Sequence, residues 1–268
     1  MKKRQLSSFA VPALLAILAL AGCRTTGPTN GCPTWTYANQ AEWGLLCPAY
    51  RECAGLEQSP RPLTSRTSAN LPLIDPRYAK SPFLVKNNRA GYTIEAKPKP
   101  SGTENRLVIG DDTYTLDEIH FHNSSEHLLP GPGRPGGSFP VEIHFVHHNV
   151  KNEKELAVIG VFMVEERGAP NNPVFEQILE NVDKDEIQMD PVVLLPLRLP
   201  RLDYRYLGSK TTPPCTQGVR WHVLAEPIVV PPIQVEALRR FHRDNKRDPQ
   251  RNGQPVFEPK PGAATPTP

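Results

Sequence analysis

Short segments of alternating apolar and polar residues recur along the chain, and each is bounded by Gly, Pro, Asn or Asp. Side chains on a β-strand point alternately to two faces, so this pattern predicts strands with one buried face. The segments span residues 91–97, 106–122, 140–149, 155–166, 192–199 and 219–230. Two further segments, 172–182 and 232–245, have helical spacing, and Asn172 followed by a proline is typical of a helix start. The pattern predicts a mainly β (α+β) domain with small peripheral helices.

The first 23 residues are typical of an export signal. They combine a basic start with an apolar run of roughly a dozen residues, too short for a membrane span of about 20. The run ends in "LAGC" at Cys23, which resembles the lipobox of bacterial lipoproteins, where cleavage leaves a lipid-bearing cysteine. We expect a signal peptide at residues 1–22 and a lipidated N-terminus with a flexible tether at 23–30. This predicts a membrane-anchored lipoprotein that faces the periplasm or the cell surface, and Arg24 slightly favours the outer membrane.

The charge of the mature chain is close to neutral. The sequence has 31 basic and 28 acidic residues, but three of the basic residues belong to the signal, which leaves 28 of each. Without a basic excess or a basic tract, no electrostatic attraction to nucleic acid is expected.

Four cysteines remain after Cys23. An even number in an exported protein indicates two disulfides, and the spacing lacks the close pairs of a sulfur-ligated zinc site. These residues are Cys32, Cys47, Cys53 and Cys215.

Six of the eight histidines fall in or near two adjacent predicted strands. His120 and His122 share one strand face, and His144 joins them if the two strands are antiparallel neighbours. Three neutral imidazoles suit zinc and leave its fourth position open, while Glu142 and Glu118 are in phase to accept ring N–H groups. A polar strand face with no metal would show the same spacing, so the pattern alone leaves both alternatives open.

The segments HFHNSSEH, VEIHFVHHN, LAVIGVFM and GSKTTPPC, followed by VRWHVL, occur in the order seen in α-class carbonic anhydrases. The chain resembles this family from about Trp35 to Val256. The resemblance implies a single domain at residues 31–257 with a large, twisted, mostly antiparallel central β-sheet. The Pro-rich residues 258–268 are then expected to form a disordered tail.

The resemblance also implies roles for individual residues. His120, His122 and His144 match the zinc ligands, so Zn²⁺ is the expected cofactor. Thr211 and Glu126 match the catalytic pair in which the threonine orients a zinc-bound hydroxide and donates to the glutamate. The expected supporting residues are Glu142, Glu118, His127 and Tyr206, and the expected substrate-binding residues are Thr212, Val146, Val158, Val219 and Trp221.

The function implied is reversible hydration of carbon dioxide to bicarbonate and a proton at the cell envelope. The alternative is a catalytically weak or inactive carbonic anhydrase-related binding module, but such modules typically lack a ligand histidine and this chain has all three. The family pairs Cys53 with Cys215, which would leave Cys32 and Cys47 to each other.

The chain departs from the family pattern at four places, one of which is Glu118, where a glutamine is common. Ala90 stands where a proton-shuttle histidine is frequent, so solvent or buffer is expected to carry the proton. Lys210 replaces a leucine at the pocket rim, where its cation either attracts bicarbonate or extends into solvent. The segment RNGQPV (251–256) matches the family's Asn-x-Arg-Pro stretch only loosely, without its arginine.

Overall fold

The computed structural model describes residues 31–64, 66–88, 93–101, 104–196, 202–242, 244–251 and 255–260. The chain divides into two compact units, Met1–Thr34 and Trp35–Pro268, and all elements named below belong to the second unit. The predicted signal peptide, Cys23, the tether and Ala90 lie outside the described residues.

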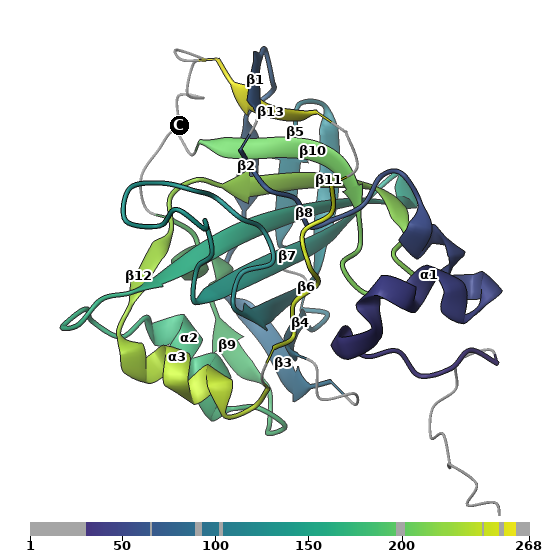
Figure 1. The fold of residues 1–268 in the computed structure, drawn as a ribbon. Helices are drawn as coiled ribbons and strands as arrows, with labels where there is room; N and C mark the ends of the chain where they lie inside the picture. The colour runs from purple at the N-terminus through teal and green to yellow at the C-terminus, as the bar shows by residue number, and fades with distance from the viewer. Residues whose placement is uncertain are drawn as a thin grey trace, which may run out of the picture. The chain divides into compact units, whose positions relative to one another are not determined.

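The described part of the second unit forms one large twisted sheet of thirteen strands (Figure 1). The main path runs β1-β13-β10-β11-β8-β7-β6-β4-β3-β9, while β12 pairs with β8, and β5 pairs with β2 and β6. Within the described ranges, the parallel pairs are β1 with β13, and β8 with both β11 and β12. The remaining pairs are antiparallel, which confirms the predicted fold class.

The strands have the following bounds: β1 Arg66–Ala69, β2 Ile74–Arg77, β3 Ser81–Asn87, β4 Ile94–Pro98, β5 Arg106–Ile109, β6 Asp112–Asn123, β7 Val141–Asn149, β8 Asn152–Glu165, β9 Ile187–Met189, β10 Asp203–Ser209, β11 Gln217–Leu224, β12 Ile228–Val230 and β13 Val256–Pro259. The helices are the short α1 Trp43–Leu46, α2 Pro173–Glu180 and α3 Pro232–Arg239, with 3-10 helices η1 Tyr37–Glu42, η2 Pro48–Ala54 and η3 Pro191–Leu194.

The two predicted helices cover one face of the sheet. The Asn172 side chain accepts from the Phe175 N–H at 3.0 Å, which confirms the predicted start of α2. α2 and α3 lie side by side (Figure 1), joined by Gln234, whose amide exchanges two 3.0 Å hydrogen bonds with the Asn172 backbone. Their apolar residues pack against β6, β7 and β8 in the larger core cluster. A second cluster, around Trp221 and Phe162, lies on the opposite face.

The predicted strand at 192–199 is wrong where the structure describes it. Residues Pro191–Leu194 form η3, because Asp190 accepts from the Val192 N–H at 3.0 Å and Pro191 supplies the first helical position. The apolar run resembles a strand in composition, but its start carries helix-capping residues. α3 also ends at Arg239, earlier than the predicted 245.

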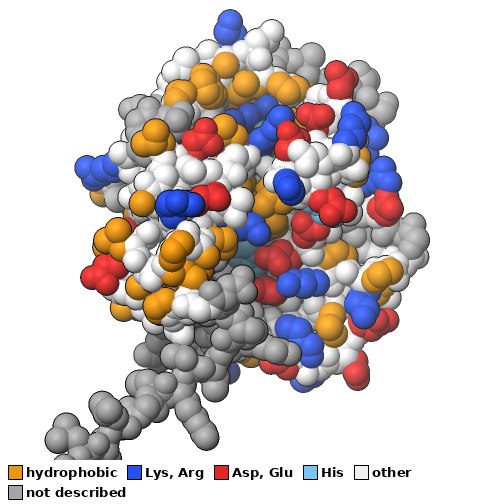
Figure 2. Space-filling model, turned by 90° about the vertical axis from the view of Figure 1, so that its right-hand side faces the viewer, with side chains coloured by type: hydrophobic (Ala, Val, Ile, Leu, Met, Phe, Trp, Pro, Cys, Tyr) orange, Lys and Arg blue, Asp and Glu red, His pale blue; other side chains and the backbone are white. Residues whose placement is uncertain are grey.

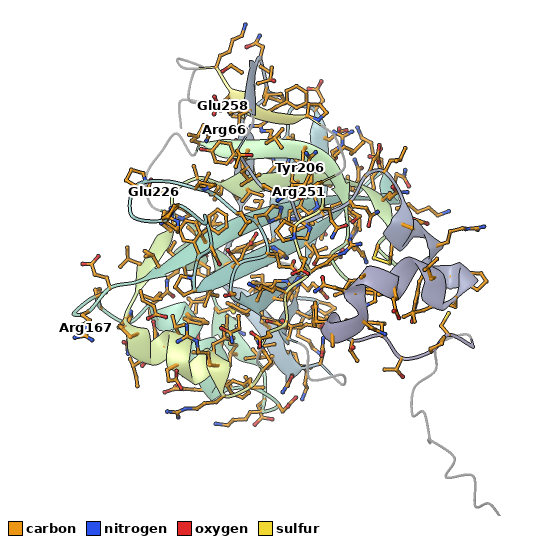
Figure 3. All side chains as sticks on the ribbon, viewed as in Figure 1. Arg66, Arg167, Tyr206, Glu226, Arg251 and Glu258 are labelled. Atoms are coloured by element: carbon orange, nitrogen blue, oxygen red, sulfur yellow. A yellow bond between two sulfur atoms is a disulfide. The ribbon has the colours of Figure 1, made fainter. Side chains whose placement is uncertain are left out.

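The C-terminal strand β13 corrects the predicted start of the disordered tail. Glu258 and Pro259 belong to this strand, which pairs in parallel with β1 and meets β10 at Phe257. Figure 3 shows Arg66 and Glu258 together at this junction, and their charged groups lie 3.7 Å apart. The ladder and the ion pair therefore hold residues that composition alone assigned to the tail.

The expected disulfide between Cys53 and Cys215 is present and joins η2 to the loop that carries Thr211. Cys32 and Cys47 are also disulfide-bonded. Their pairing with each other stays a prediction.

Removing the Cys53–Cys215 bridge is expected to destabilise the fold. The bridge spans 162 residues, so the double variant Cys53→Ser/Cys215→Ser should lower the free energy of unfolding by about 2–5 kcal/mol in urea denaturation. Cys32→Ser/Cys47→Ser, which would open a far shorter loop, is the matched control and should lose less. Equal stability of the first variant and the wild type would contradict this expectation.

His147 lies on the helix-covered side of β7 and is fully buried. Its Nε2 lies 2.7 Å from the Tyr78 hydroxyl and its Nδ1 lies 3.1 Å from the Ala157 carbonyl, so the neutral ring is satisfied on both sides. Burial lowers the pKa of His147 to about 3, against its usual 6.5, although the Ala157 carbonyl opposes the shift.

This burial makes stability depend on pH. Because the unfolded chain protonates His147 near pH 6.5 and the folded chain does not until about pH 3, stability should fall as the pH drops below 6.5. The ring should account for about 2 kcal/mol of the loss between pH 7.5 and 5. Unfolding of His147→Gln at both pH values should show a loss smaller by that amount. If His147→Gln loses as much stability between the two pH values as the wild type, the expectation is contradicted. His148→Gln, at the neighbouring and partly exposed position, is the control variant.

Candidate metal and active site

Three histidine rings converge on the sheet face opposite α2 and α3. His120 on β6 lies directly opposite His144 on β7, and His122 follows two residues later on the same face of β6. The three rings offer nitrogen atoms that all lie within 4.8 Å of one another, and His144 Nδ1 is 3.3 Å from His120 Nε2. The antiparallel pairing that the strand phase required is therefore present.

Two of the nitrogens that face away from the shared point are held by acceptors. His122 Nδ1 lies 2.6 Å from the Asn245 carbonyl, and His144 Nε2 lies 3.0 Å from Glu142 Oε1. A ring that donates from one nitrogen keeps a lone pair on the other. His122 Nε2 is buried and makes no hydrogen bond to any described residue. The three rings therefore offer three inward lone pairs, and the one on His122 Nε2 has no hydrogen-bond partner among the described residues. This set of donors fits a zinc ion.

Glu142 connects one of these histidines, His144, to the protein behind it. Its Oε2 accepts from the backbone N–H groups of Glu126 and His127, both at 2.9 Å. Its Oε1 lies 2.7 Å from His127 Nδ1 as well as 3.0 Å from His144 Nε2. Burial opposes ionisation, but the two rings lower the pKa of Glu142 well below its usual 4.5. A second group of possible ligand atoms, His127, Glu142 and His144, is thus already joined by internal hydrogen bonds.

His127 supports the site from behind, as the resemblance implied. Its Nε2 lies 2.7 Å from the hydroxyl of Tyr206 on β10, which in turn donates to Ser59 Oγ at 2.8 Å. Ser59 Oγ also accepts from the Ser209 N–H at 3.0 Å, one residue before Lys210. The chain of contacts runs from the histidines to the strand that leads into the Thr211 loop.

Glu126 is buried beside the inward nitrogens. Its Oε2 lies 3.5 Å from His122 Nε2 and 3.9 Å from His144 Nδ1. Burial raises the pKa of Glu126 well above its usual 4.5, although hydrogen bonds from the Arg247 backbone and the Thr211 hydroxyl oppose the shift. The structure thus brings together the predicted Thr211 and Glu126.

Two residues at the site were not predicted from the sequence. Asn245 holds His122 through its carbonyl and also accepts, through Oδ1, from the Asn123 N–H at 2.7 Å. Arg247 donates its backbone N–H to Glu126 at 2.7 Å and its guanidinium to the Ser59 and Cys53 carbonyls. An Asn-x-Arg stretch is thus present at 245–247, whereas RNGQPV does not contain this spacing. Its spacing was the signal that could have identified it.

A cavity of about 160 Å³ opens above the histidines. Its residues are Trp35, Tyr37, Asn88, Thr93, Glu95, Glu118, His120, His122, His144, Val146, Leu156, Val158, Lys210, Thr211, Thr212 and Trp221. Four of the five predicted substrate residues are among them. The fifth, Val219, is buried in the cluster around Trp221 and does not reach the wall, whereas Leu156 does. Figure 2 shows a histidine in a hollow whose rim carries acidic and basic side chains.

Glu118 forms part of a charged rim. Its Oε1 lies 3.2 Å from His120 Nδ1, and its Oε2 lies 3.2 Å from Lys97 Nζ, which is also 2.9 Å from Glu95. Burial opposes ionisation, but His120 and Lys97 lower the pKa of Glu118 to about 2. Lys97 therefore offsets the negative charge of Glu118 near the histidines. Lys210 lines the cavity with an exposed side chain, so both interpretations of its cation stay open.

Comparison with known proteins identifies one family. The sequence model described as eukaryotic-type carbonic anhydrase matches residues 38–257. A carbonic anhydrase of Neisseria gonorrhoeae is 34% identical over 221 residues, which cover 80% of this chain and 83% of that protein. One from Pectobacterium carotovorum is 32% identical over 239 residues, which cover 86% and 92%. A solved structure of a hyperthermostable carbonic anhydrase from a hydrothermal vent chimney matches with a TM-score of 0.73 at 32% identity, covering 85% of this chain and 100% of that one.

Replacing Glu142 by Gln is expected to weaken zinc binding about 10- to 100-fold, because the amide no longer gives His144 a charged acceptor. Competition with a chelator measures the affinity, and circular dichroism confirms that the variant is folded. Glu95→Gln is the matched control, since Glu95 lines the same cavity but pairs with Lys97. Equal zinc affinity of Glu142→Gln and wild type would contradict the orienting role of this carboxylate.

Proposed function

Because the chain belongs to the eukaryotic-type, or α, carbonic anhydrase family, whose activity is carbon dioxide hydration, we propose that it works with a zinc ion held by His120, His122 and His144. The observation that carries the proposal is the convergence of three ring nitrogens, with two of the opposite nitrogens held at 3.0 Å or less by acceptors. When bound, zinc supplies a Lewis acid that makes water nucleophilic near neutral pH. Carbonic anhydrase is itself the standard example of this chemistry.

Thr211 and Glu126 orient the attacking water. The Thr211 hydroxyl contacts Glu126, and an ionised carboxylate only accepts hydrogen bonds, so with Glu126 in its ionised form the hydroxyl donates a hydrogen bond to it. The hydroxyl oxygen can then only accept from the cavity side. A water molecule that donates to Thr211 is held with a lone pair toward the apolar wall, where carbon dioxide would lie. A cation at the histidines would also favour the ionised form of the buried Glu126.

The apolar wall suits a substrate without net charge. Val146, Val158 and Trp221 line one side of the cavity, and the Trp221 indole is fixed by its N–H bond to the Ser209 carbonyl at 3.0 Å. Carbon dioxide displaces water from this surface at little cost, whereas bicarbonate loses hydration there. The wall therefore favours binding of the substrate and release of the product.

The balance of the reaction requires a proton exit. Carbon dioxide and water give bicarbonate and one proton per turnover, so the cavity must pass a proton to solvent in every cycle. At the position where the family frequently has a proton-shuttle histidine, this chain has Ala90.

The N-terminal sequence supports the further proposal that the enzyme is a lipoprotein of the cell envelope, attached through Cys23 and preferentially in the outer membrane. None of the helices within the described ranges is long and apolar enough to cross a membrane.

His120→Ala is the direct test of the proposed function. The wild type is expected to carry one zinc ion per chain and to hydrate carbon dioxide in a stopped-flow assay. The variant should lose most of its zinc, and kcat/KM should fall by at least about 100-fold. His148→Ala, which removes a β7 histidine outside the proposed ligand set, should keep its zinc.

Equal activity of His120→Ala and wild type would contradict the proposed ligand set. A zinc-loaded wild type that hydrates no carbon dioxide would instead favour the binding-module alternative.

A further inference from the structure

We propose that His148, positioned by Asp117, passes the proton between the cavity and the solvent. This inference rests on the proposed hydration reaction and its need for a proton exit. Among the described residues, the other histidines outside the proposed zinc set are all buried: His127, His147, His222 and His242. The His148 side chain keeps 27% of its surface exposed, so it is the histidine of this group that can exchange protons with solvent.

The phase of β7 brings His148 to the edge of the cavity. His144, Val146 and His148 alternate on one face of the strand, and Val146 lines the cavity. In the register with β8, His148 lies opposite Leu156, which also lines the cavity. Four residues of strand place His148 about 13 Å beyond His144, a span that hydrogen-bonded water in the cavity mouth can bridge.

A β-bulge in β6 places a carboxylate against this ring. The pairing of β6 with β7 shifts between Leu116 and Glu118, which makes Asp117 the extra residue of the strand. Two consecutive acids therefore reach the histidine face: Glu118 contacts His120 at 3.2 Å, and Asp117 Oδ1 lies 2.6 Å from His148 Nδ1. A regular strand would turn Asp117 to the opposite, apolar face.

The contact with Asp117 determines which nitrogen accepts the proton. A carboxylate accepts, so Nδ1 carries the hydrogen and Nε2 keeps its lone pair. His148 Nε2 makes no hydrogen bond to the residues that the structure describes. The proton leaves cavity water through intervening waters and binds Nε2, which gives an imidazolium. It then passes to a base in solution, and the ring returns to its neutral form.

The charges around the ring suit this cycle. On β6 the nearest acids are Asp117 and Glu118, and the charge of Glu118 is already offset by Lys97. On β8 the facing residue is the uncharged Leu156. The neighbouring His147 ring lies on the other side of β7 with Tyr78. Asp117 is therefore the counter-charge that an imidazolium at His148 meets directly.

Stopped-flow hydration in a bulky buffer at low concentration tests the proposal. His148→Ala should lower kcat roughly 10-fold. This decrease is smaller than the one expected when an enzyme loses its general base, because the buffer still accepts protons. Its kcat/KM for carbon dioxide should stay at the wild-type value, since proton release follows conversion of the substrate. Added imidazole, a small base, should restore kcat.

Asp117→Asn should shift the midpoint of the kcat–pH profile to lower pH, because the protonated ring loses its counter-charge. Thr115→Val, directly opposite His148 in the ladder, is the matched control and should leave kcat, kcat/KM and the pH profile unchanged.

An unchanged kcat in His148→Ala would overturn the inference. So would a parallel fall in kcat and kcat/KM that imidazole does not rescue, because that result indicates structural damage. A zinc-loaded wild type without hydration activity would overturn the proposed function itself, and the two failures are thus distinguishable.

Discussion

The register between β6 and β7 is the constraint on which the site depends. His120 faces His144 across this ladder, and a slip by one residue would turn every side chain of one strand to the opposite face. Both strands lie inside the sheet, with β4 and β5 on one side and β8 on the other, so each is held by two neighbours. The apolar residues of the opposite face, such as Ile119 and Phe121, pack under α2 and give the register a large hydrophobic stabilisation.

A single buried carboxylate then ties the ladder to the rest of the site. Glu142 is fully buried, and an unpaired charge there would be costly, but two backbone N–H groups and two imidazoles surround its oxygens. Through His127, Tyr206 and Ser59 the same network reaches the strand before Thr211. The loop beyond is fastened by the Cys53–Cys215 bridge. The orientation of the histidines and the place of the threonine are therefore coupled through one set of contacts.

Strand periodicity predicted the parts of the site that lie on regular elements. His120, His122, His144 and Glu142 were found because their spacing obeys a two-residue repeat. Asn245 and Arg247 were missed because they lie in irregular chain after α3, where no period indicates which atom turns inward. Asp117 was missed for a different reason: the bulge breaks the alternation locally, and only the ladder shows it. Similarly, η3 was predicted as a strand because of its apolar composition, whereas its capping residues make it a 3-10 helix.

The pairing of β1 with β13 has a consequence for biosynthesis. This ladder joins residues such as Ser68 and Glu258, which are 190 positions apart, and it covers the edge that β10 would otherwise present. A chain that lacks its last strand exposes unpaired backbone groups, the usual template for edge-to-edge aggregation. The pairing of β10 with β13, and of β13 with β1, is therefore completed only after residues 256–259 have been synthesised, so this edge of the sheet forms late.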